Sequence, residues 1–442
     1  MAALAGLLHT RGFAVDGCDL QRNRHTARLE ETGIQVAIPH DPAHLEPVPV
    51  CCVCSTAVPL NQPECRAACA QGIPLARRGD VLAAVLQDDY AVAICGTHGK
   101  TTTTAMAVHA LRATCGLPTF LVGGEWEAPG RVFAPGPLPV TVVEADESDG
   151  TLAAYTPSLT VVTGIDYDHM EHFSDEATFL DVFAAVLRQT QRCIVYCRDD
   201  PRLTDLVQRA ETATPRVSYG LHPVANWRAV DLEPDGAATW FTLMQADREL
   251  GRFRLPVPGR HNVQNALAAL SVVAVQGGSV QQAAAALADF QPVRRRFELL
   301  GTWRGITVYS DYAHHPTEIK ALLQTARPLA RGRVLAIFQP HRYTRTQTLG
   351  PDFPAAFEGA DWLVLVPVYA ASESPLAGGT TEDLAQHFAT QMPDLRCSCA
   401  DGWSAAWRMV VDEAQPGDIL LLVGAGDIEQ LAERVRNDDE TI

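Results

Sequence analysis

Residues 91–104 read AVAICGTHGKTTTT, and this stretch predicts more about the fold than any other. The apolar run 91–95 is typical of a buried strand, and a helical pattern follows Lys100. A glycine-rich turn between a strand and a helix directs backbone N–H groups and the positive end of the helix dipole toward an anion. Lys100 is placed to reach the β- and γ-phosphates, and the Thr101 hydroxyl to hold Mg²⁺. The stretch therefore predicts a nucleoside triphosphate site.

This loop is a shortened variant of the common pattern, because Ile94 stands where a further glycine is usual. Lysine is rare in the chain, which has only Lys100 and Lys320. A loop that merely resembles a phosphate site is the alternative. The residues expected to bind ATP here are Gly96, Thr97, His98, Gly99, Lys100, Thr101 and Thr102.

Composition excludes several classes of protein. The chain has 442 residues, enough for two or three domains, and its net charge of −17 argues against a nucleic-acid-binding surface. It has no apolar run near the ~20 residues of a membrane span, and its first residues lack a secretory signal pattern, so a cytoplasmic protein is expected. Its 12 cysteines do not pair at zinc-site spacings, and we interpret them as small buried hydrophobic residues in a reducing compartment.

Apolar strand-like runs alternate with helical patterns along the chain, which predicts an α/β fold with parallel sheets. Three domains are expected, over residues 1–86, 87–300 and 301–442. The first resembles half of a dinucleotide-binding fold, with predicted strands at 12–19 and 48–55. Asp19 ends the first of these strands, where an acid can meet a ribose.

Acidic residues follow two further apolar strands. The segment EADESD, from Glu144 to Asp149, ends one strand at the edge where ligands bind in open α/β sheets. Its carboxylates can hold Mg²⁺ that bridges phosphate oxygens, whereas a solvated acidic turn is the alternative. The next strand ends in DYDHMEH (166–172), where His169 could ligate a second Mg²⁺ or orient a carboxylate.

Other polar clusters lie at helix starts and strand ends. Asn262 and Asn265 share one face of a helix start, where amides suit a purine edge but also serve as structural caps. The run 294–296 is three arginines and would suit phosphate, with a solvated charge run as the alternative. Segments 311–316 and 339–345 follow two more strands, and the second carries arginines that can bind a carboxylate.

Taken together and in this order, these segments resemble the Mur ligases, ATP-dependent amide-forming enzymes of peptidoglycan synthesis. The resemblance covers essentially the whole chain. It is closest to the branch that joins L-alanine to UDP-N-acetylmuramate. The branch that attaches a recycled tripeptide shares AHHPT but not FQPHRYTRT or VYAASE. The segments that carry the resemblance are GTHGKTTTT, EADESD, DHM, GRHNVQNALAA, RRRFE, DYAHHPTE, FQPHRYTRT, VYAASESP and GAGDI.

The resemblance implies a three-domain fold: a truncated Rossmann-like N-terminal domain, a P-loop ATP-binding central domain and a Rossmann-like C-terminal domain. It implies ATP and Mg²⁺ as cofactors, UDP-N-acetylmuramate and L-alanine as substrates, no nucleic acid or membrane partner, and a monomer or homodimer. The resemblance also implies roles for single residues. On the ATP side, metal would be bound by Thr101, Glu144 and His169, adenine would be contacted by His261, Asn262 and Asn265, and the nucleotide phosphate and ribose by Arg296 and Asp311. On the substrate side, UDP would be contacted by Asp19 and Ser55, and alanine and the muramoyl carboxylate would be bound by Tyr312, His314, His341, Arg342 and Arg345. The catalytic residues would be Lys100, Glu144, His169 and Arg296.

The chain departs from the family pattern at three places. The family opens with a strand and the glycine loop G-x-G-G-x-G-M, and the resemblance begins at Met1, so we expect either an upstream start or an incomplete UDP site. Gly164 replaces a family asparagine, and Ser310-Asp311 replaces a pair of acids. Some relatives use a carbamylated lysine for a second metal, which neither lysine of this chain is expected to supply.

The function predicted is ligation of L-alanine to UDP-N-acetylmuramate through an acyl-phosphate. A tripeptide-adding ligase and a nucleotide-binding homologue without ligase activity are the alternatives. A nicotinamide oxidoreductase, suggested by Asp19 and Gly424-Ala-Gly426, lacks the complete glycine fingerprint.

Overall fold

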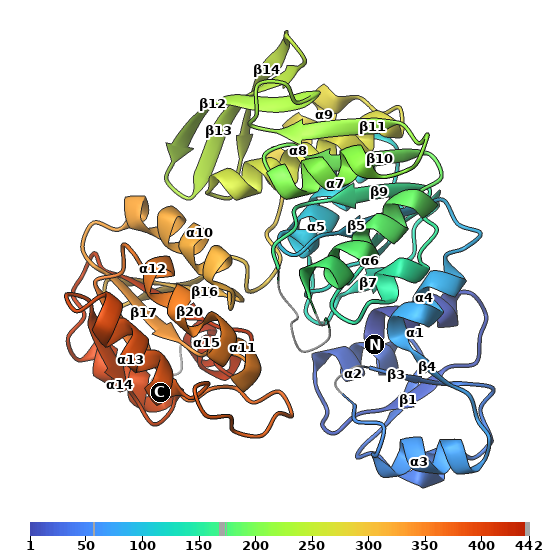
Figure 1. The fold of residues 1–442 in the computed structure, drawn as a ribbon, viewed down its shortest axis with the longest axis horizontal. Helices are drawn as coiled ribbons and strands as arrows, with labels where there is room; N and C mark the ends of the chain where they lie inside the picture. Colours follow the sequence, from blue (N-terminus) through green and yellow to red (C-terminus); the bar gives the residue numbers. More distant parts are fainter. Residues whose placement is uncertain (56–57, 168–172, 174, 438–442) are drawn as a thin grey trace. The chain divides into compact units, whose positions relative to one another are not determined.

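The computed structural model describes residues 1–55, 58–167, 173 and 175–437, and Figure 1 shows its helices and strands. The chain forms two compact units, Met1–Val293 and Arg294–Ile442. Both are α/β with largely parallel sheets, which confirms the predicted fold class. The predicted domain boundaries after residues 86 and 300 stay predictions.

The first unit is built on a ten-stranded sheet with the order β14-β13-β12-β11-β10-β9-β5-β8-β6-β7. In this order, neighbouring strands from β11 to β6 pair in parallel, and β7 is antiparallel to β6. At the other end, β13 is antiparallel to both β12 and β14. The strands are β5 Ala91–Cys95, β6 Pro118–Leu121, β7 Phe133–Ala134, β8 Leu138–Glu144, β9 Leu159–Val162, β10 Cys193–Cys197, β11 Arg216–Gly220, β12 Trp227–Asp235, β13 Ala238–Gln245 and β14 Arg248–Leu255.

The centre of this sheet is buried on both faces. Every residue of β5, β9 and β10 is buried, as expected for apolar runs in parallel strands that helices cover. Helix α5 packs against α8 and α9, and α7 packs against β10 with α6 beside it. The helices are α5 Lys100–Thr114, η2 Thr151–Ala154, α6 Glu176–Gln189, α7 Pro201–Arg209, α8 Arg260–Val275, α9 Val280–Ala286 and η3 Leu287–Asp289.

The first ninety residues form two separate two-stranded parallel sheets, β1-β2 and β3-β4. Strands predicted over 12–19 and 48–55 are only three residues long, because within the described residues each strand has a partner on one side only. Val50, in the second predicted range, is 93% exposed. The elements are α1 Ala2–Thr10, β1 Asp16–Cys18, α2 Arg24–Glu31, β2 Gln35–Ala37, η1 Pro42–Leu45, β3 Cys52–Cys54, α3 Pro63–Ala70, β4 Leu75–Arg77 and α4 Arg78–Val85.

The second unit has a six-stranded sheet with the order β15-β16-β20-β17-β18-β19, parallel except for β15. Each residue of β17, β18 and β20 is buried. The strands are β15 Glu298–Trp303, β16 Ile306–Asp311, β17 Val334–Phe338, β18 Trp362–Leu365, β19 Arg396–Cys399 and β20 Ile419–Val423. The helices are α10 Pro316–Ala326, η4 Arg327–Leu329, α11 Tyr343–Leu349, η5 Gly350–Asp352, α12 Phe353–Ala356, α13 Thr381–Gln391, α14 Trp403–Val411 and α15 Glu429–Arg436.

Two expectations about the chain as a whole can be compared with this structure. Among the described residues, none of the helices has the length and apolar character that crossing a membrane requires. The cysteines are all unpaired, and four of them, Cys65, Cys95, Cys193 and Cys197, are buried as expected. The expectation is wrong for the exposed Cys51, Cys69 and Cys399, because Cys51 precedes β3, Cys69 lies on an exposed position of α3, and Cys399 ends the edge strand β19.

Candidate active site

The phosphate loop joins the buried strand β5 to helix α5. Gly96 and Gly99 have φ angles of 118° and 81°, in the left-handed region that favours glycine. A Cβ on Gly96 would lie 2.3 Å from Thr163 Oγ1, and one on Gly99 would lie 2.6 Å from Asn265 Oδ1. Both positions therefore require glycine for conformation and for space.

Lys100 is the first residue of α5 and points back into the loop. Its Nζ donates to Gly96 O at 2.8 Å, and lies 2.8 and 3.0 Å from the two carboxylate oxygens of Glu147. Glu147 is fully buried. Burial lowers the pKa of Lys100, but the Glu147, Asp146 and Glu144 carboxylates together outweigh it, so the pKa lies above the ordinary lysine value. Lys100 therefore stays a fixed cation beside the loop.

Thr101 and Glu144, two of the three predicted metal ligands, are in contact. Thr101 Oγ1 donates to Glu144 Oε1 at 3.0 Å. The other carboxylate oxygen accepts from the Gly123 backbone N–H at 2.8 Å, which fixes the carboxylate. A hydroxyl and a carboxylate are oxygen donors of the kind that Mg²⁺ prefers, so these residues fit that ion. The third predicted ligand, His169, lies outside the described residues.

The remaining loop residues bind the neighbouring strand end. Thr97 Oγ1 donates to Asp166 O at 2.9 Å, and His98 Nε2 lies 3.4 Å from Asp166 Oδ2. The Thr97 backbone N–H donates to Gly164 O at 3.0 Å, so the residue that replaces the family asparagine supports the loop through its carbonyl. These contacts fix the loop from outside its own sequence.

The predicted adenine residues lie in the first two turns of α8, where the Asn265 side chain is close to Gly99 of the loop. Asn262 and Asn265 are each 7% exposed. Asn265 Oδ1 accepts from Thr103 Oγ1 at 3.2 Å, and Asn265 Nδ2 donates to Asn262 Oδ1 at 3.3 Å. Asn262 Nδ2 donates in turn to Pro258 O at 2.7 Å. The Asn265 amide thus joins α8 to α5, and the Asn262 amide supports it from the same helix. Contact with adenine by these residues and by His261 stays a prediction.

In the second unit, predicted nucleotide-side residues gather where β16 ends. Asp311 accepts from the backbone N–H groups of Phe297 and Ala313 at 2.7 and 2.8 Å. Burial raises the pKa of Asp311 to about 6, although the Arg296 guanidinium opposes the shift. The Arg296 guanidinium carbon lies 5.1 Å from the centre of the Tyr312 ring, within cation–π range.

The residues predicted to surround alanine and the muramoyl carboxylate form a row of rings. Tyr312 and His314 have ring centres 5.4 Å apart, His314 and His341 5.7 Å, and His341 stacks on Tyr369 at 5.6 Å. Arg345, only 7% exposed, places Nη1 3.2 Å from His341 Nδ1. The structure therefore brings four of the predicted side chains together within this unit.

Arg342 lies beside this row in a conformation that is rare for arginine. Its φ is 71°, and its Nη1 lies 3.7 Å from Glu373 Oε1. Glu373 also accepts from the Thr344 backbone N–H and hydroxyl at 3.1 and 2.7 Å. Neither Glu373 nor Tyr369 was predicted as a site residue. Their only signal in the sequence is the segment VYAASESP, which contains both.

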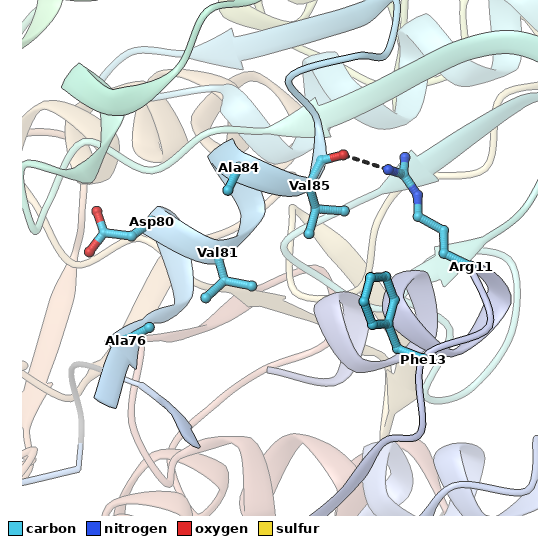
Figure 2. Close-up of a pocket in the computed structure, with 7 residues that line it drawn as sticks. All are labelled: Arg11, Phe13, Ala76, Asp80, Val81, Ala84 and Val85. Atoms are coloured by element: carbon cyan, nitrogen blue, oxygen red, sulfur yellow. Dashed lines mark hydrogen bonds between the residues drawn. The ribbon is translucent and has the colours of Figure 1, made fainter. Parts of the chain in front are cut away.

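The predicted UDP-side residues lie in the first ninety residues. Asp19 follows β1, and its Oδ1 accepts from the Leu20 backbone N–H at 2.7 Å. Ser55 directly follows β3. A pocket of about 510 Å³ in this part of the unit contains no predicted site residue, and Figure 2 shows Arg11 donating to Val85 O at its edge. Its lining is Arg11, Phe13, Ala76, Asp80, Val81, Ala84 and Val85.

Comparison with known proteins gives this arrangement a family. Residues 1–90 match the model described as "Mur ligase family, catalytic domain", residues 94–273 the Mur ligase middle domain, and residues 295–426 the Mur ligase glutamate ligase domain. The chain belongs to the Mur ligase family. The resemblance inferred from the sequence motifs is thereby confirmed.

Individual Mur ligases resemble this chain over nearly its whole length. A UDP-N-acetylmuramate–L-alanine ligase of Brucella anthropi is 40% identical over 98% of this chain and 93% of its own length. The crystal structure of a UDP-N-acetylmuramate-alanine ligase from Thermotoga maritima superposes with a TM-score of 0.82 at 26% identity, covering 99% of this chain and 96% of the other. A murein peptide ligase from Psychrobacter arcticus shares the fold, with a TM-score of 0.72 at 23% identity over 99% and 96% of the two chains.

Proposed function

We propose that this Mur ligase uses ATP to join L-alanine to the lactyl carboxylate of UDP-N-acetylmuramate. The observation that carries the ATP-dependent step is the loop in which Lys100, held by Gly96 O and Glu147, lies next to the Thr101–Glu144 pair. The substrate assignment is supported by the relatives of that name that match nearly the whole chain.

In the first step, the lactyl carboxylate attacks the γ-phosphorus of ATP to give an acyl-phosphate, and ADP leaves. In the second, the alanine amine attacks the acyl carbon, phosphate leaves, and the amine loses a proton. Both steps concentrate negative charge, which a fixed cation stabilises without reorganising at the moment of reaction. Lys100 is such a cation, because its ion pair with the buried Glu147 keeps it charged and in place.

Bound Mg²⁺ would neutralise charge on the phosphate oxygens. Within the described residues, Thr101 and Glu144 are the side chains we propose to hold it, and His169 stays the predicted third ligand. Glu144 is positioned for this role by the Gly123 N–H, which leaves its other oxygen on the Thr101 hydroxyl.

The residues of the second unit receive the organic substrates in this proposal. Arg345 and Arg342 supply guanidinium groups for carboxylates, and His341, which stacks on Tyr369, contacts the buried Arg345. Arg296 and Asp311 are proposed to contact phosphate and ribose.

The test is a coupled assay of phosphate release by the purified full chain. ATP and Mg²⁺ are kept constant, and each of several amino acids is added with and without UDP-N-acetylmuramate. We expect release only when both the sugar nucleotide and L-alanine are present, with a product mass equal to their sum less one water. Release that is independent of the sugar nucleotide would refute the substrate assignment, and release that requires a tripeptide in place of alanine would favour the recycling branch.

A further inference from the structure

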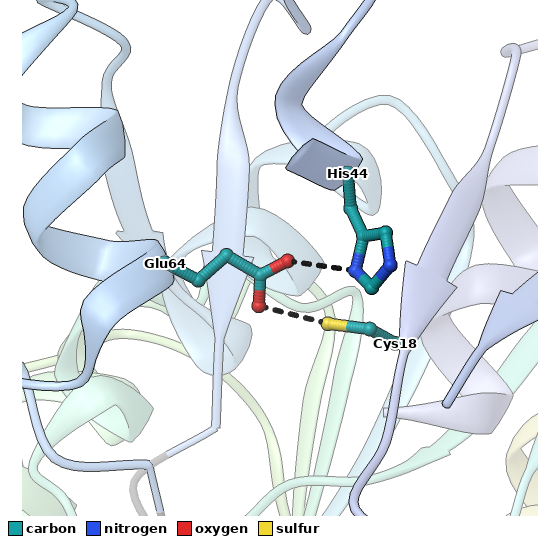
Figure 3. Close-up of side chains that lie close together, drawn as sticks. All are labelled: Cys18, His44 and Glu64. Atoms are coloured by element: carbon teal, nitrogen blue, oxygen red, sulfur yellow. Dashed lines mark hydrogen bonds and ion pairs between the residues drawn. The ribbon is translucent and has the colours of Figure 1, made fainter. Parts of the chain in front are cut away.

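Four side chains that commonly bind metals meet in the first ninety residues, and none of them has a role in the proposed ligation. Cys18 is the last residue of β1, and His40 lies between β2 and η1. His44 lies in η1, and Glu64 lies in the first turn of α3. Figure 3 shows Cys18 and His44 approaching the two carboxylate oxygens of Glu64 from different segments.

The ligand atoms are spaced like the donors around a small cation. Cys18 Sγ lies 3.0 Å from Glu64 Oε2 and 2.9 Å from His40 Nδ1. His44 Nδ1 lies 3.3 Å from Glu64 Oε1, and His40 Nδ1 lies 3.4 Å from Glu64 Oε2. Tetrahedral Zn²⁺ with bonds of about 2.0–2.3 Å separates its ligand atoms by roughly 3.3–3.7 Å. Small outward movements of these side chains would therefore open the space for an ion.

The environment favours a cation rather than a core contact. The side chains of Glu64 and His40 are 15% and 16% exposed, and that of His44 is 31% exposed, so an ion could enter and would then be largely shielded. His44 Nδ1 is itself buried and, within the described part of the chain, accepts or donates no hydrogen bond. In this structure the Cys18 thiol donates a hydrogen bond to Glu64 Oε2.

We propose that Cys18, His44 and Glu64, with His40 as the fourth ligand, form a Zn²⁺ site. A thiolate, two imidazoles and a carboxylate are the donor types that Zn²⁺ takes, whereas Mg²⁺ and Ca²⁺ take oxygen donors. The site is thus chemically distinct from the oxygen pair of Thr101 and Glu144.

The proposed ion would join two parts of the structure that share no sheet. Cys18 and His40 belong to the β1-β2 sheet and the loop after it, whereas Glu64 begins the helix that connects β3 to β4. Short strands and small cores make such a region weakly stable by itself, and a metal that binds only the folded form adds its binding free energy to folding. The site therefore acts as a cross-link between the two small sheets.

Cobalt substitution tests the site in the full chain. The protein, kept reduced and stripped of metal with a chelator, is titrated with Co²⁺ and then with Zn²⁺ in excess Mg²⁺. We expect a thiolate-to-Co²⁺ charge-transfer band in the near ultraviolet and strong tetrahedral bands in the visible. Zn²⁺ at one equivalent should abolish both, while Mg²⁺ should not. Only weak octahedral bands, or a spectrum without the thiolate band, would overturn the proposal.

Single-residue variants test which side chains bind the ion. Cys18→Ser should remove the charge-transfer band, and Cys18→Ser and His44→Ala should each weaken Zn²⁺ binding in a competition titration by at least about 100-fold, since even residues that only orient ligands contribute 10- to 100-fold. Cys69→Ser is the matched control, because Cys69 is exposed on the same helix as Glu64. Wild-type binding by Cys18→Ser, or loss of the band in Cys69→Ser, would refute the assignment.

A measurement on the unmodified chain covers the case in which Cys18→Ser does not fold. The reduced protein is alkylated with and without Zn²⁺, and the modified cysteines are located by peptide mass spectrometry. Zn²⁺ should slow modification of Cys18 at least tenfold and leave the exposed Cys51 and Cys69 unchanged. Equal rates at Cys18 with and without Zn²⁺ would show that it is not a ligand.

Discussion

The polar cluster after β5 in the first unit and the one after β16 and β17 in the second are built in different ways. The first is made mostly of backbone: two glycines with positive φ, a carbonyl that accepts from Lys100, and one buried carboxylate. The second is made of side chains, in which rings pack in a row and an arginine contacts one of them. Both lie at the carboxyl ends of parallel strands, where open α/β sheets bind ligands.

The two clusters differ in how much of their structure the local sequence determines. In the phosphate loop, two glycines with positive φ lie within five positions of each other, so few substitutions are possible there without strain. In the second cluster, the adjacent rings of Tyr312, His314, His341 and Tyr369 come from three separate segments, and the contacts between them are made by side chains. We therefore expect all-or-none effects in the loop and graded effects in the ring row.

The largest effect is expected at Lys100. Lys100→Ala should lower the rate of phosphate release by about 10³-fold, because it removes the preorganised cation at the transferring phosphoryl group. Lys320→Ala, which removes the only other lysine, at an exposed position on α10, should retain wild-type activity. Initial rates at saturating substrates measure both variants.

Loss of Lys100 also leaves Glu147 buried without its cation, which costs about 3–5 kcal/mol of stability. The double variant Lys100→Met, Glu147→Gln separates the two effects, since it removes both charges together. It should unfold at a higher temperature than Lys100→Ala and remain inactive. Recovery of turnover in the double variant would show that Lys100 has only a structural role.

A second prediction compares two glycines of nearly equal φ. Gly96→Ala should destabilise the protein by about 3 kcal/mol or more, because strain is added to a clash with Thr163 and Gly164. Gly116→Ala, at φ 114°, meets only Leu138 Cβ at 3.9 Å and should cost about 1–2 kcal/mol, from strain alone.

Chemical denaturation of the two glycine variants gives these values. If both variants lose a similar amount of stability, the phosphate loop is not sterically fixed. The proposed difference between the loop and the ring row would then be wrong for the loop.

The sequence predicted the loop well because its signal is local. A buried apolar run, two glycines and a following helix are sufficient to place Lys100 and Thr101, and the structure puts β5 and α5 where the pattern predicts. The same holds for the strand ends in the second unit, since Asp311 lies at the end of β16. The partners of these residues were less predictable. Glu147 was one acid among several, and nothing in the sequence singled out its ion pair with Lys100.

Contacts between distant segments could not be predicted. Asn262 and Asn265 carry the pattern of a ligand-binding helix start, but their amide partners include Thr103, some 160 positions earlier, and appear only after folding. Likewise, the spacing of Cys18, His40, His44 and Glu64 matches no metal motif, because the four lie on segments that tertiary structure brings together. The predicted lengths of two strands were wrong for a related reason. Strands β1 and β3 are short because their sheet partners, and not the propensities of their residues, set where they end.

A graded effect is expected at Arg345, in the ring row. Arg345→Lys should raise the KM for alanine or the sugar nucleotide by about 10- to 100-fold, because lysine keeps the charge but loses the planar fork that binds a carboxylate at two points. The KM for ATP should change less than threefold. Steady-state kinetics with one substrate varied at a time separates these values. A change confined to ATP would move Arg345 out of the proposed carboxylate site.

The smallest effect is the pH dependence from Asp311. Burial raises the pKa of its folded form to about 6, above the ordinary value of 3.8, so the neutral form is the one that folding favours. Its contribution to stability is therefore complete below about pH 4 and is lost as the pH rises through 6. Asp311→Asn cannot ionise, so the free energy of unfolding of wild type relative to this variant should fall by about 1 kcal/mol between pH 5 and 7, at about 1.4 kcal/mol per pKa unit.

Urea denaturation of both proteins at half-unit pH intervals measures this difference. Ser310→Ala, one residue earlier on the same strand and also buried, is the control for pH effects from the rest of the unit. A difference that rises with pH would mean that Arg296 and the two backbone N–H donors outweigh burial and lower the pKa of Asp311. The second cluster would then hold a fixed anion, as the loop holds a fixed cation in Lys100, and the two clusters would differ less than their contacts suggest.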